Sequence, residues 1–224
     1  MGVALASVLV ATSCDGGDGG GSGTGVTAPD PPDSVVDVPT VTEAPPPPPD
    51  GPIARLVRRQ VEGSELPPGV RYRRFDELID ATGGISIEVP ASWIDRDVGP
   101  HLIGSAEEPF IEASPDRDGF RSSFAVPGIQ FSTLSTSTTV DSALAGFGFS
   151  EQCDDRGERP FESRAFTGML QVWHGCDDTD ASIVLVAANR NESTVTTLIL
   201  AQVVTRADLV ALDRAVATFR ILEN

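Results

Sequence analysis

The most regular hydrophobic pattern lies in the last third of the chain. Residues 182–188 (SIVLVAA) and 194–204 (TVTTLILAQVV) are apolar, β-branched runs that predict two long strands. The polar turn 189–192 between them predicts an antiparallel pair. Neither run keeps a strict apolar–polar alternation, and a strand that is apolar on both sides has to be covered on both sides. We therefore expect these strands at the centre of a sheet with a layer on each face.

Shorter upstream segments predict further strands. Residues 85–89 (ISIEV) alternate cleanly, which is typical of a half-buried strand, and the turn 82–84 joins them to a strand around 71–78. Residues 129–134 predict another strand. Residues 161–173 predict either one long strand or a hairpin divided near 169–170.

Three helices are expected between and after these strands. Ser114 is a candidate N-cap followed by proline at the first helical position, and Phe120 and Phe124 would form the buried face of that helix. Residues 140–147 predict a second short helix. Thr205 and Asp208 form a capping-box pattern at the start of a C-terminal helix. Its apolar stripe at helical spacing consists of Leu209, Leu212, Val216 and Phe219. The pattern predicts an α+β domain: a mainly antiparallel sheet sandwiched by helices.

The N-terminus has the pattern of a targeting segment. Residues 3–12 (VALASVLVAT) are too short to span a bilayer as a helix but match the apolar region of a secretory signal. The sequence Ala11-Thr12-Ser13-Cys14, followed by aspartate and glycine, resembles a bacterial lipobox. That resemblance implies that residues 1–14 are a lipoprotein signal peptide with its lipobox, and that Cys14 carries the lipid.

Composition divides the remaining chain in two. Residues 15–69 are rich in glycine, proline and acid, and positions 15–50 hold seven acidic and no basic residues. Such a segment cannot bury enough apolar surface to fold, so we predict a disordered tether with a reach of ~40 Å. Residues 70–224 have the length of one globular domain.

The charge balance excludes several classes of function. The chain has 16 basic and 33 acidic residues, a net charge of −17, and none of the basic residues is lysine. This balance argues against nucleic-acid binding, and the missing lysine excludes P-loop and Schiff-base chemistry. Residues 51–74 are the exception, with six arginines against Glu62 and Glu65. They either dock on an acidic partner or, more simply, form a solvated segment that balances the acidic domain.

Two cysteines remain after Cys14. Cys153 and Cys176 both lie in polar, acidic loops. In a protein outside the cytoplasm they predict a disulfide, which would contribute roughly 3–3.5 kcal/mol by closing a loop of about 24 residues. The alternative is metal ligation together with His174, which the absence of a second closely spaced cysteine disfavours.

Catalytic motifs are scarce. The sequence has two histidines, His101 and His174, and no Gly-x-Ser-x-Gly elbow. Asp116-Arg117-Asp118-Gly119 has the start of a calcium loop, but Pro127 stands where that loop needs glutamate. We assign no catalytic residue, cofactor or metal ligand. Trp93, Trp173 and His174 are the candidate ligand surface, with core packing as the alternative for each aromatic residue.

Much of the stretch 77–222 resembles a family of actinobacterial secreted or lipid-anchored domains. The segments that carry the resemblance are 80–93 (DATGGISIEVPASW), 113–116 (ASPD), 126–129 (VPGI), the surroundings of Cys153 and Cys176, and 202–209 (QVVTRADL). Members are often named serine proteases because some carry a trypsin-like domain alongside. The Val-Pro-x-x-Trp segment 89–93 also resembles PsbP and its relatives, which implies an α/β/α sandwich.

These observations predict a non-enzymatic, lipid-anchored domain on the extracellular face of a bacterial cell membrane. It would act on a partner protein or envelope ligand and would meet the membrane only through its anchor. One alternative is a hydrolase or an accessory part of a trypsin-like protease system. The other is a carrier for a small apolar ligand.

Overall fold

The computed structural model describes residues 51–222, except 62–65, 104–105, 135–137, 164–165 and 191–194. The predicted signal peptide with Cys14, and the predicted tether as far as residue 50, lie outside the described residues. Part of the predicted turn 189–192 also lies outside them.

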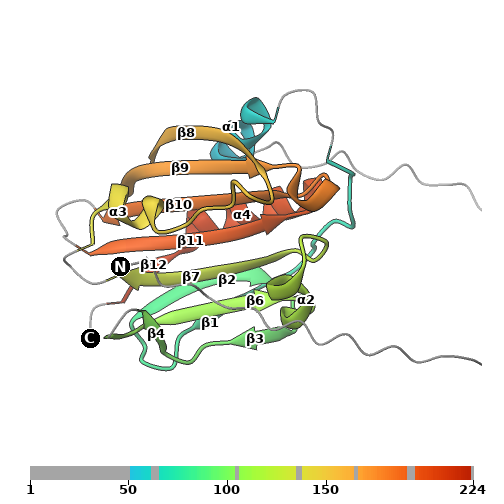
Figure 1. Ribbon diagram of the computed structural model, residues 1–224. Coiled ribbons are helices and arrows are strands. Elements are labelled where there is room, and N and C mark those ends of the chain that lie inside the picture. Colours follow the sequence, from blue (N-terminus) through green and yellow to red (C-terminus); the bar gives the residue numbers. More distant parts are fainter. Residues whose placement is uncertain are drawn as a thin grey trace, which may run out of the picture. The chain divides into compact units, whose positions relative to one another are not determined.

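A seven-stranded sheet forms the centre of the domain (Figure 1). All of its neighbouring strands are antiparallel. Its order is β3 (Asp95–Asp97), β6 (Phe110–Ser114), β7 (Gly128–Leu134), β11 (Thr196–Val203), β10 (Ser182–Arg190), β9 (Phe166–His174) and β8 (Asp154–Glu162). The predicted antiparallel pair is therefore confirmed as β10 and β11, which lie in the interior of the sheet.

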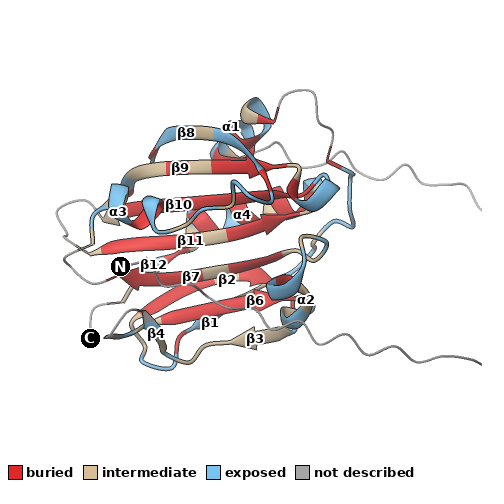
Figure 2. Cartoon of the chain, viewed as in Figure 1, coloured by how far each residue is buried: buried red, intermediate tan, exposed pale blue. Residues whose placement is uncertain are grey.

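Both faces of β10 are buried, as the continuous apolar run requires (Figure 2). Val184 and Val186 belong to one core, and Ile183 and Leu185 belong to a second core on the opposite face. Successive side chains of a strand point to opposite faces, so one apolar run supplies both cores.

Different elements cover the two faces. The larger core lies under α1 (Pro52–Gln60), α4 (Arg206–Thr218) and a small antiparallel sheet of β1 (Phe75–Ile79), β2 (Ile85–Pro90) and β12 (Arg220–Ile221). The second core lies under α3 (Val140–Ala145) and the segment that follows it. Near β6 the second face is covered by α2 (Arg117–Ser122). The α+β class with a mainly antiparallel sheet is thus confirmed, although a small sheet shares the covering of one face with helices.

Several sequence predictions hold locally. The β1–β2 hairpin, β7, α3 and the capping box at Thr205 and Asp208 all occur where the pattern placed them. Asp208 is 2% exposed, and its carboxylate accepts hydrogen bonds from the backbone N–H of Val204 and Thr205. The hydroxyl group of Tyr72 donates a third bond to it at 2.6 Å.

Other predictions need correction. The hairpin in 161–173 turns after Glu162, so that β8 and β9 are two nine-residue strands. The N-cap of α2 is Asp116, which accepts from the N–H of Gly119, and the Ser114 hydroxyl instead donates to the carbonyls of Asp116 and Pro127. The short strands β3, β4 (His101–Ile103), β5 (Ala106–Glu108) and β6 were not predicted, because their segments contain charged residues that interrupt any apolar period.

The largest difference is α1, which lies inside the range predicted as tether. Its buried side chains Ile53, Ala54, Val57 and Val61 recur at helical spacing and are 0–3% exposed. That stripe was a usable signal, but the surrounding arginines, glycines and prolines gave the segment the composition of a linker. The folded domain therefore includes residues 51–61, upstream of the boundary predicted near residue 70.

A carboxylate from α4 holds the N-terminus of α1. Gly51 is the N-cap residue and offers no side chain, so the first N–H groups need another acceptor. Asp213 supplies it, accepting from Gly51 N–H at 2.9 Å, Ile53 N–H at 2.8 Å and Ala54 N–H at 3.1 Å. A Cβ atom at position 51 would lie 2.4 Å from Asp213 Cγ, so only glycine permits this approach.

Replacing Asp213 with alanine should loosen α1 specifically. Loss of an N-cap acceptor costs about 1–2 kcal/mol, and here three donors lose their partner together. Hydrogen exchange followed by mass spectrometry should show faster exchange over residues 53–57. Asp141→Ala, which removes an exposed carboxylate from α3, is the matched control. Equal protection of α1 in both variants would show that apolar packing alone holds it.

Candidate functional site

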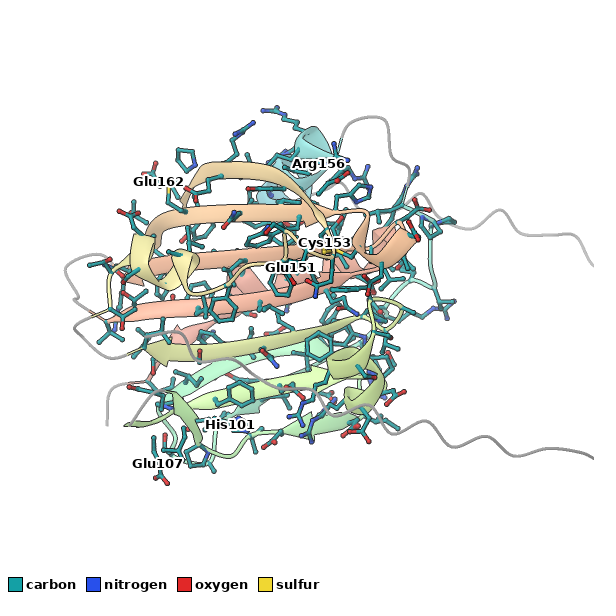
Figure 3. The ribbon with its side chains drawn as sticks, viewed as in Figure 1. His101, Glu107, Glu151, Cys153, Arg156 and Glu162 are labelled. Atoms are coloured by element: carbon teal, nitrogen blue, oxygen red, sulfur yellow. A yellow bond between two sulfur atoms is a disulfide. The ribbon has the colours of Figure 1, made fainter. Side chains whose placement is uncertain are left out.

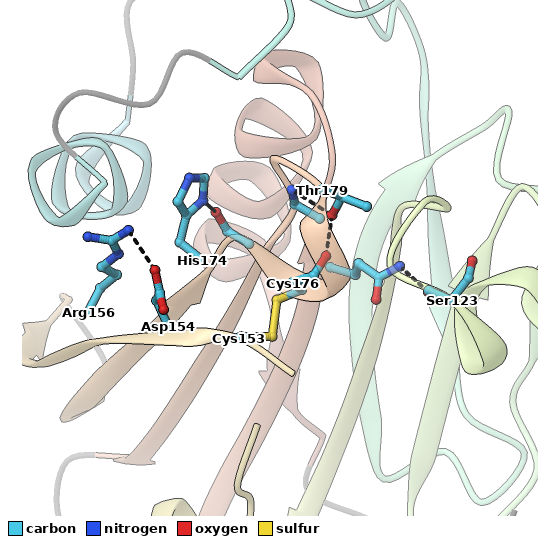
Figure 4. Close-up of a disulfide and its surroundings, with 10 residues drawn as sticks. Ser123, Cys153, Asp154, Arg156, His174, Cys176 and Thr179 are labelled. Carbon is cyan, nitrogen blue, oxygen red and sulfur yellow. Dashed lines mark hydrogen bonds and ion pairs between the residues drawn. A yellow bond between two sulfur atoms is a disulfide. The ribbon is translucent and has the colours of Figure 1, made fainter. Parts of the chain in front are cut away.

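The predicted disulfide is present between Cys153 and Cys176 (Figure 4). The two residues are 7% and 0% exposed and belong to the second core with Trp173 and Ile183. The bond joins the start of β8 to the short 3₁₀ helix η1 (Cys176–Asp178). Because the two sulfur atoms are bonded to each other, neither is a thiolate that could bind a metal with His174.

His174 lies on the other face of the sheet, at the end of β9, and is 3% exposed. A hydrogen bond of 2.9 Å joins its Nδ1 to Oγ of Ser182 on β10. Burial lowers the pKa of His174 below its ordinary value of 6.5, and the nearby Arg156 guanidinium lowers it further. The carboxylates of Asp180 and Asp154 raise the pKa of His174, but by less than burial and Arg156 lower it. The imidazole is therefore held in its neutral form.

Asp154, His174 and Ser182 occupy one row across three neighbouring strands, which are the residue types of a serine-hydrolase triad. The geometry does not fit that chemistry. Ser182 is 0% exposed, so no substrate reaches its hydroxyl. The carboxylate of Asp154 pairs with Arg156 at 3.3 Å (Figure 4), whereas a triad carboxylate orients the imidazole. The row is a cross-strand polar contact at the end of the sheet.

The two tryptophans predicted for a ligand surface lie in different cores. Trp93 is 3% exposed, packs against Tyr72 with ring centroids 5.8 Å apart, and donates from Nε1 to the Tyr72 hydroxyl at 3.1 Å. Trp173 is 2% exposed and packs against Phe149 in the second core. The structure does not bring Trp93, Trp173 and His174 together, and each has a packing or hydrogen-bonding role inside the domain.

A cluster of ion pairs surrounds Glu112, which the sequence analysis did not single out. Glu112 lies on β6 and is 0% exposed. Its carboxylate accepts from Nε of Arg117 at 2.8 Å, from Nε of Arg121 at 2.9 Å and from Nε2 of Gln130 at 2.7 Å. Two cations and one amide thus offset the cost of burying one carboxylate. We call this group, with Asp95, Asp97 and His101, the Glu112 cluster.

The Glu112 cluster reaches the surface at two places: directly at Arg121, and at His101 by way of Arg117 and Asp97. Arg117 also pairs with Asp97 at 2.9 Å, and Asp97 lies 3.4 Å from Nε2 of His101. The His101 ring stacks on Phe110 at a centroid distance of 3.8 Å. The N–H of Gly99 is the main cause that keeps the pKa of Asp97 below its usual range, so this carboxylate stays ionised. Figure 3 shows His101 and Glu107 at the β4–β5 end, far from Arg156 beside α1.

The Glu112 cluster holds charged side chains at the surface, where they can contact a polar or charged partner. The hydrogen bond to Glu112 is the main cause that raises the pKa of Arg117, which stays charged. Arg121 and His101, whose side chains are 42% and 37% exposed, carry the cluster's charge and hydrogen-bonding groups to water. The pair of arginines at positions 117 and 121, one helical turn apart, was the available sequence signal.

Among the described residues, no three or more His, Cys, Asp or Glu side chains gather in a way that could hold a metal ion. Within the same residues, no helix is both long and apolar enough to span a bilayer.

Comparisons with known proteins leave the family open. No protein-family model matches the chain, and no curated protein matches it. Among solved structures, it is similar to the crystal structure of the Saccharomyces cerevisiae Ran-binding protein Mog1p. The identity is 12% and the TM-score 0.42, over 66% of this chain and 95% of that one.

Removing the charge of Glu112 alone should destabilise the domain. Glu112→Leu leaves two partly buried arginines without their acceptor, at an expected cost of about 3 kcal/mol in the free energy of unfolding. Replacing all three charges (Glu112→Leu, Arg117→Met, Arg121→Met) should cost less, because Asp95 and Asp97, which lose Arg117, are partly exposed to water and no fully buried charge is left unpaired. Urea unfolding measures both. If the triple variant were less stable than Glu112→Leu, the cluster would contribute more to the free energy of unfolding than the mutual neutralisation of its charges.

His174 should make the domain sensitive to mild acid. Its folded pKa is lowered, so as the pH falls below about 6.5 the unfolded chain takes up a proton that the folded chain excludes. The free energy of unfolding should therefore fall from pH 7.5 towards the folded pKa and level off below it. His174→Asn, which keeps a partner for Ser182, should flatten this dependence in urea titrations. If the free energy of unfolding of His174→Asn changed with pH as steeply as that of the native chain, groups other than His174 would dominate the pH dependence.

Proposed function

We propose that this chain is a lipid-anchored extracellular domain of a bacterial cell envelope that binds a partner protein or envelope ligand and performs no catalysis itself. One observation carries the proposal: the side chains most capable of chemistry are used to hold the fold. His174 is bonded to a buried serine, and Glu112 is enclosed by two arginines. Side chains fixed in this way stabilise the domain, and we assign the binding of the partner to its surface.

Two features support the extracellular location. A buried disulfide is a device of oxidising compartments, and it stabilises a domain of this size where disulfides persist. Upstream of the domain stand the lipobox-like segment ending at Cys14 and a long acidic, proline-rich stretch suited to a spacer. For the fold we propose a PsbP-like α/β/α sandwich, supported by the strand exit from Val89 to Trp93 and by the layers on both faces of the large sheet.

For the binding surface we propose the β3–β4 region beside the Glu112 cluster. Ile94 and Leu102 are 78% and 73% exposed and flank β3 and the turn that follows it. Ile94 precedes Asp95, which pairs with Arg117, and Leu102 follows His101. Apolar side chains next to a rigid charged network have the composition of a protein-binding surface.

In-cell crosslinking of the tagged native chain, followed by mass spectrometry, tests the function. An envelope protein should be enriched with the native chain and lost with Ile94→Ser/Leu102→Ser. Ala145→Ser is the control, since Ala145 is exposed on α3, which packs against β9, β10 and β11. Cys14→Ala should move the protein from membrane to medium and reduce the capture.

Three outcomes would contradict the proposal. Membrane retention of Cys14→Ala would refute the lipid anchor. Capture that survives the Ile94/Leu102 change would refute the assigned surface. Labelling of a serine by a fluorophosphonate probe, or hydrolysis of a peptide or glycan by the purified domain, would favour the hydrolase alternative.

A further inference from the structure

Three exposed arginines lie on the irregular segment that precedes β1. Arg71, Arg73 and Arg74 belong to residues 67–74 (PPGVRYRR), which form neither helix nor strand (Figure 2). Val70 beside them is 87% exposed. We call residues 67–74 the arginine segment. From composition alone, this basic region either docks on an acidic partner or balances the charge of an acidic domain.

Hydrogen bonds hold the arginine segment against the domain. The carbonyl of Pro67 accepts from the N–H of Arg206 at 2.8 Å, and the carbonyl of Arg74 accepts from the N–H of Ala91 at 3.0 Å. Between these two points, the hydroxyl group of Tyr72 is hydrogen-bonded to two side chains of the domain. Tyr72 is therefore anchored inward, while the arginines on either side of it are exposed to water.

Gly69 lets the segment lie close to the start of α4. Its φ is +69°, and a Cβ atom at this position would collide with the side chain of Thr205. The segment is thus fixed along its length before any ligand is present. Binding would not require the segment to become ordered, which lowers the entropic cost of association.

The carboxylates of the domain do not neutralise the three arginines. Arg96 and Arg214 each pair with a carboxylate, at 2.8 and 2.6 Å. In the part of the chain that the structure describes, the side chains of Arg71, Arg73 and Arg74 have no such ion pair and no hydrogen bond. Charge balance would be achieved by such pairs, so it does not explain three cations placed side by side. Neighbouring like charges repel each other, and an anionic ligand would offset that repulsion.

Charge on the rest of the domain favours a narrow anionic ligand. Residues 51–224 contain 16 arginines and 26 acidic residues, a net charge of −10, and the exposed Glu77 follows close after the arginine segment. A broad anionic surface such as a membrane would meet these carboxylates as well as the arginines. A single peptide strand can contact the arginines alone. Exposed Val70 beside them suits a peptide that also carries an apolar side chain.

The arginine segment is connected to the binding surface assigned above. Trp93 donates a hydrogen bond to Tyr72 of the segment, and the next residue, Ile94, is 78% exposed. Two residues earlier, the N–H of Ala91 donates to the carbonyl of Arg74. Residues 91–94 therefore link the two surfaces, and one partner can contact both.

We propose that the arginine segment binds an acidic peptide segment of the partner protein. Its carboxylates pair with Arg71, Arg73 and Arg74, and an apolar side chain packs on Val70. A guanidinium group presents its N–H donors in a fork that matches a carboxylate, so arginine is suited to this role. The inference deepens the proposed function and rests on it in taking the partner to be a protein.

Peptide titrations with the full chain test the proposal. The chain carries Cys14→Ala for solubility, and the probe is a synthetic peptide of alternating glutamate and valine, titrated by calorimetry at low ionic strength. Arg71→Gln/Arg73→Gln/Arg74→Gln should weaken binding about tenfold, because three exposed ion pairs of modest strength are lost together. Salt at ~1 M should abolish binding, since the screening length falls to ~3 Å.

A matched control separates position from total charge. Arg55→Gln/Arg159→Gln/Arg220→Gln removes three exposed arginines from other elements and should leave the affinity for the peptide unchanged. Circular dichroism checks that both triple variants fold. Absence of peptide binding by the native chain, or equal affinities of the two triple variants, would overturn the proposal. So would binding of phosphatidylglycerol vesicles without binding of the peptide, which would assign the segment to lipid.

In-cell crosslinking distinguishes a failure of this inference from a failure of the proposed function. The triple variant of the arginine segment should lose the envelope protein that the native chain captures. If that variant captures it normally while Ile94→Ser/Leu102→Ser does not, the proposed function holds and the inference fails. If no envelope protein is captured although the native chain binds the peptide, the proposed function fails and the segment remains an acidic-peptide site.

Discussion

Both faces of β10 and β11 have to be kept from water, and the domain is arranged around that requirement. Side chains of β10 alternate between two cores, with Val184 and Val186 in one and Ile183 and Leu185 in the other. Burying such side chains contributes roughly 1.5–3 kcal/mol each, so neither face can be left open. Helices α1 and α4 and the small sheet cover one face, while α3 and the disulfide-linked segment cover the other. The covering elements come from segments before, between and after the central strands, and α1 is one of them.

Buried and half-buried carboxylates connect those separate elements. Asp213 on α4 accepts three N–H groups of α1 across about 160 residues. Asp208 joins the start of α4 to Tyr72, and Glu112 joins β6 to α2 and β7. A carboxylate removed from water must be matched by donors or cations, so each of these groups fixes the position of its partners. In this acidic protein, arginine side chains and backbone N–H groups pair with these carboxylates, and the pairs hold elements of the fold together.

The use of polar side chains for contacts inside the domain also bears on its function. The residues that invite a catalytic interpretation, such as the Asp154–His174–Ser182 row, are committed to internal contacts and have no accessible nucleophile. The Glu112 cluster reaches water at Arg121 and His101, and the exposed apolar side chains Ile94 and Leu102 lie beside it. These are recognition features on a rigid support, which is the basis for the binding function that we propose.

The sequence by itself determined the α+β class, the β10–β11 pair, the capping box of α4 and the Cys153–Cys176 pairing. Each of these rests on a local signal: an apolar run, a turn, a cap at fixed spacing, or a choice of only two cysteines. The tertiary structure alone decided that Trp93 and Trp173 lie in different cores, that Glu112 is buried between two arginines, and that α1 is part of the domain. Those outcomes depend on partners distant in the sequence, such as Asp213 for Gly51, and no local pattern records which distant donor a carboxylate will meet.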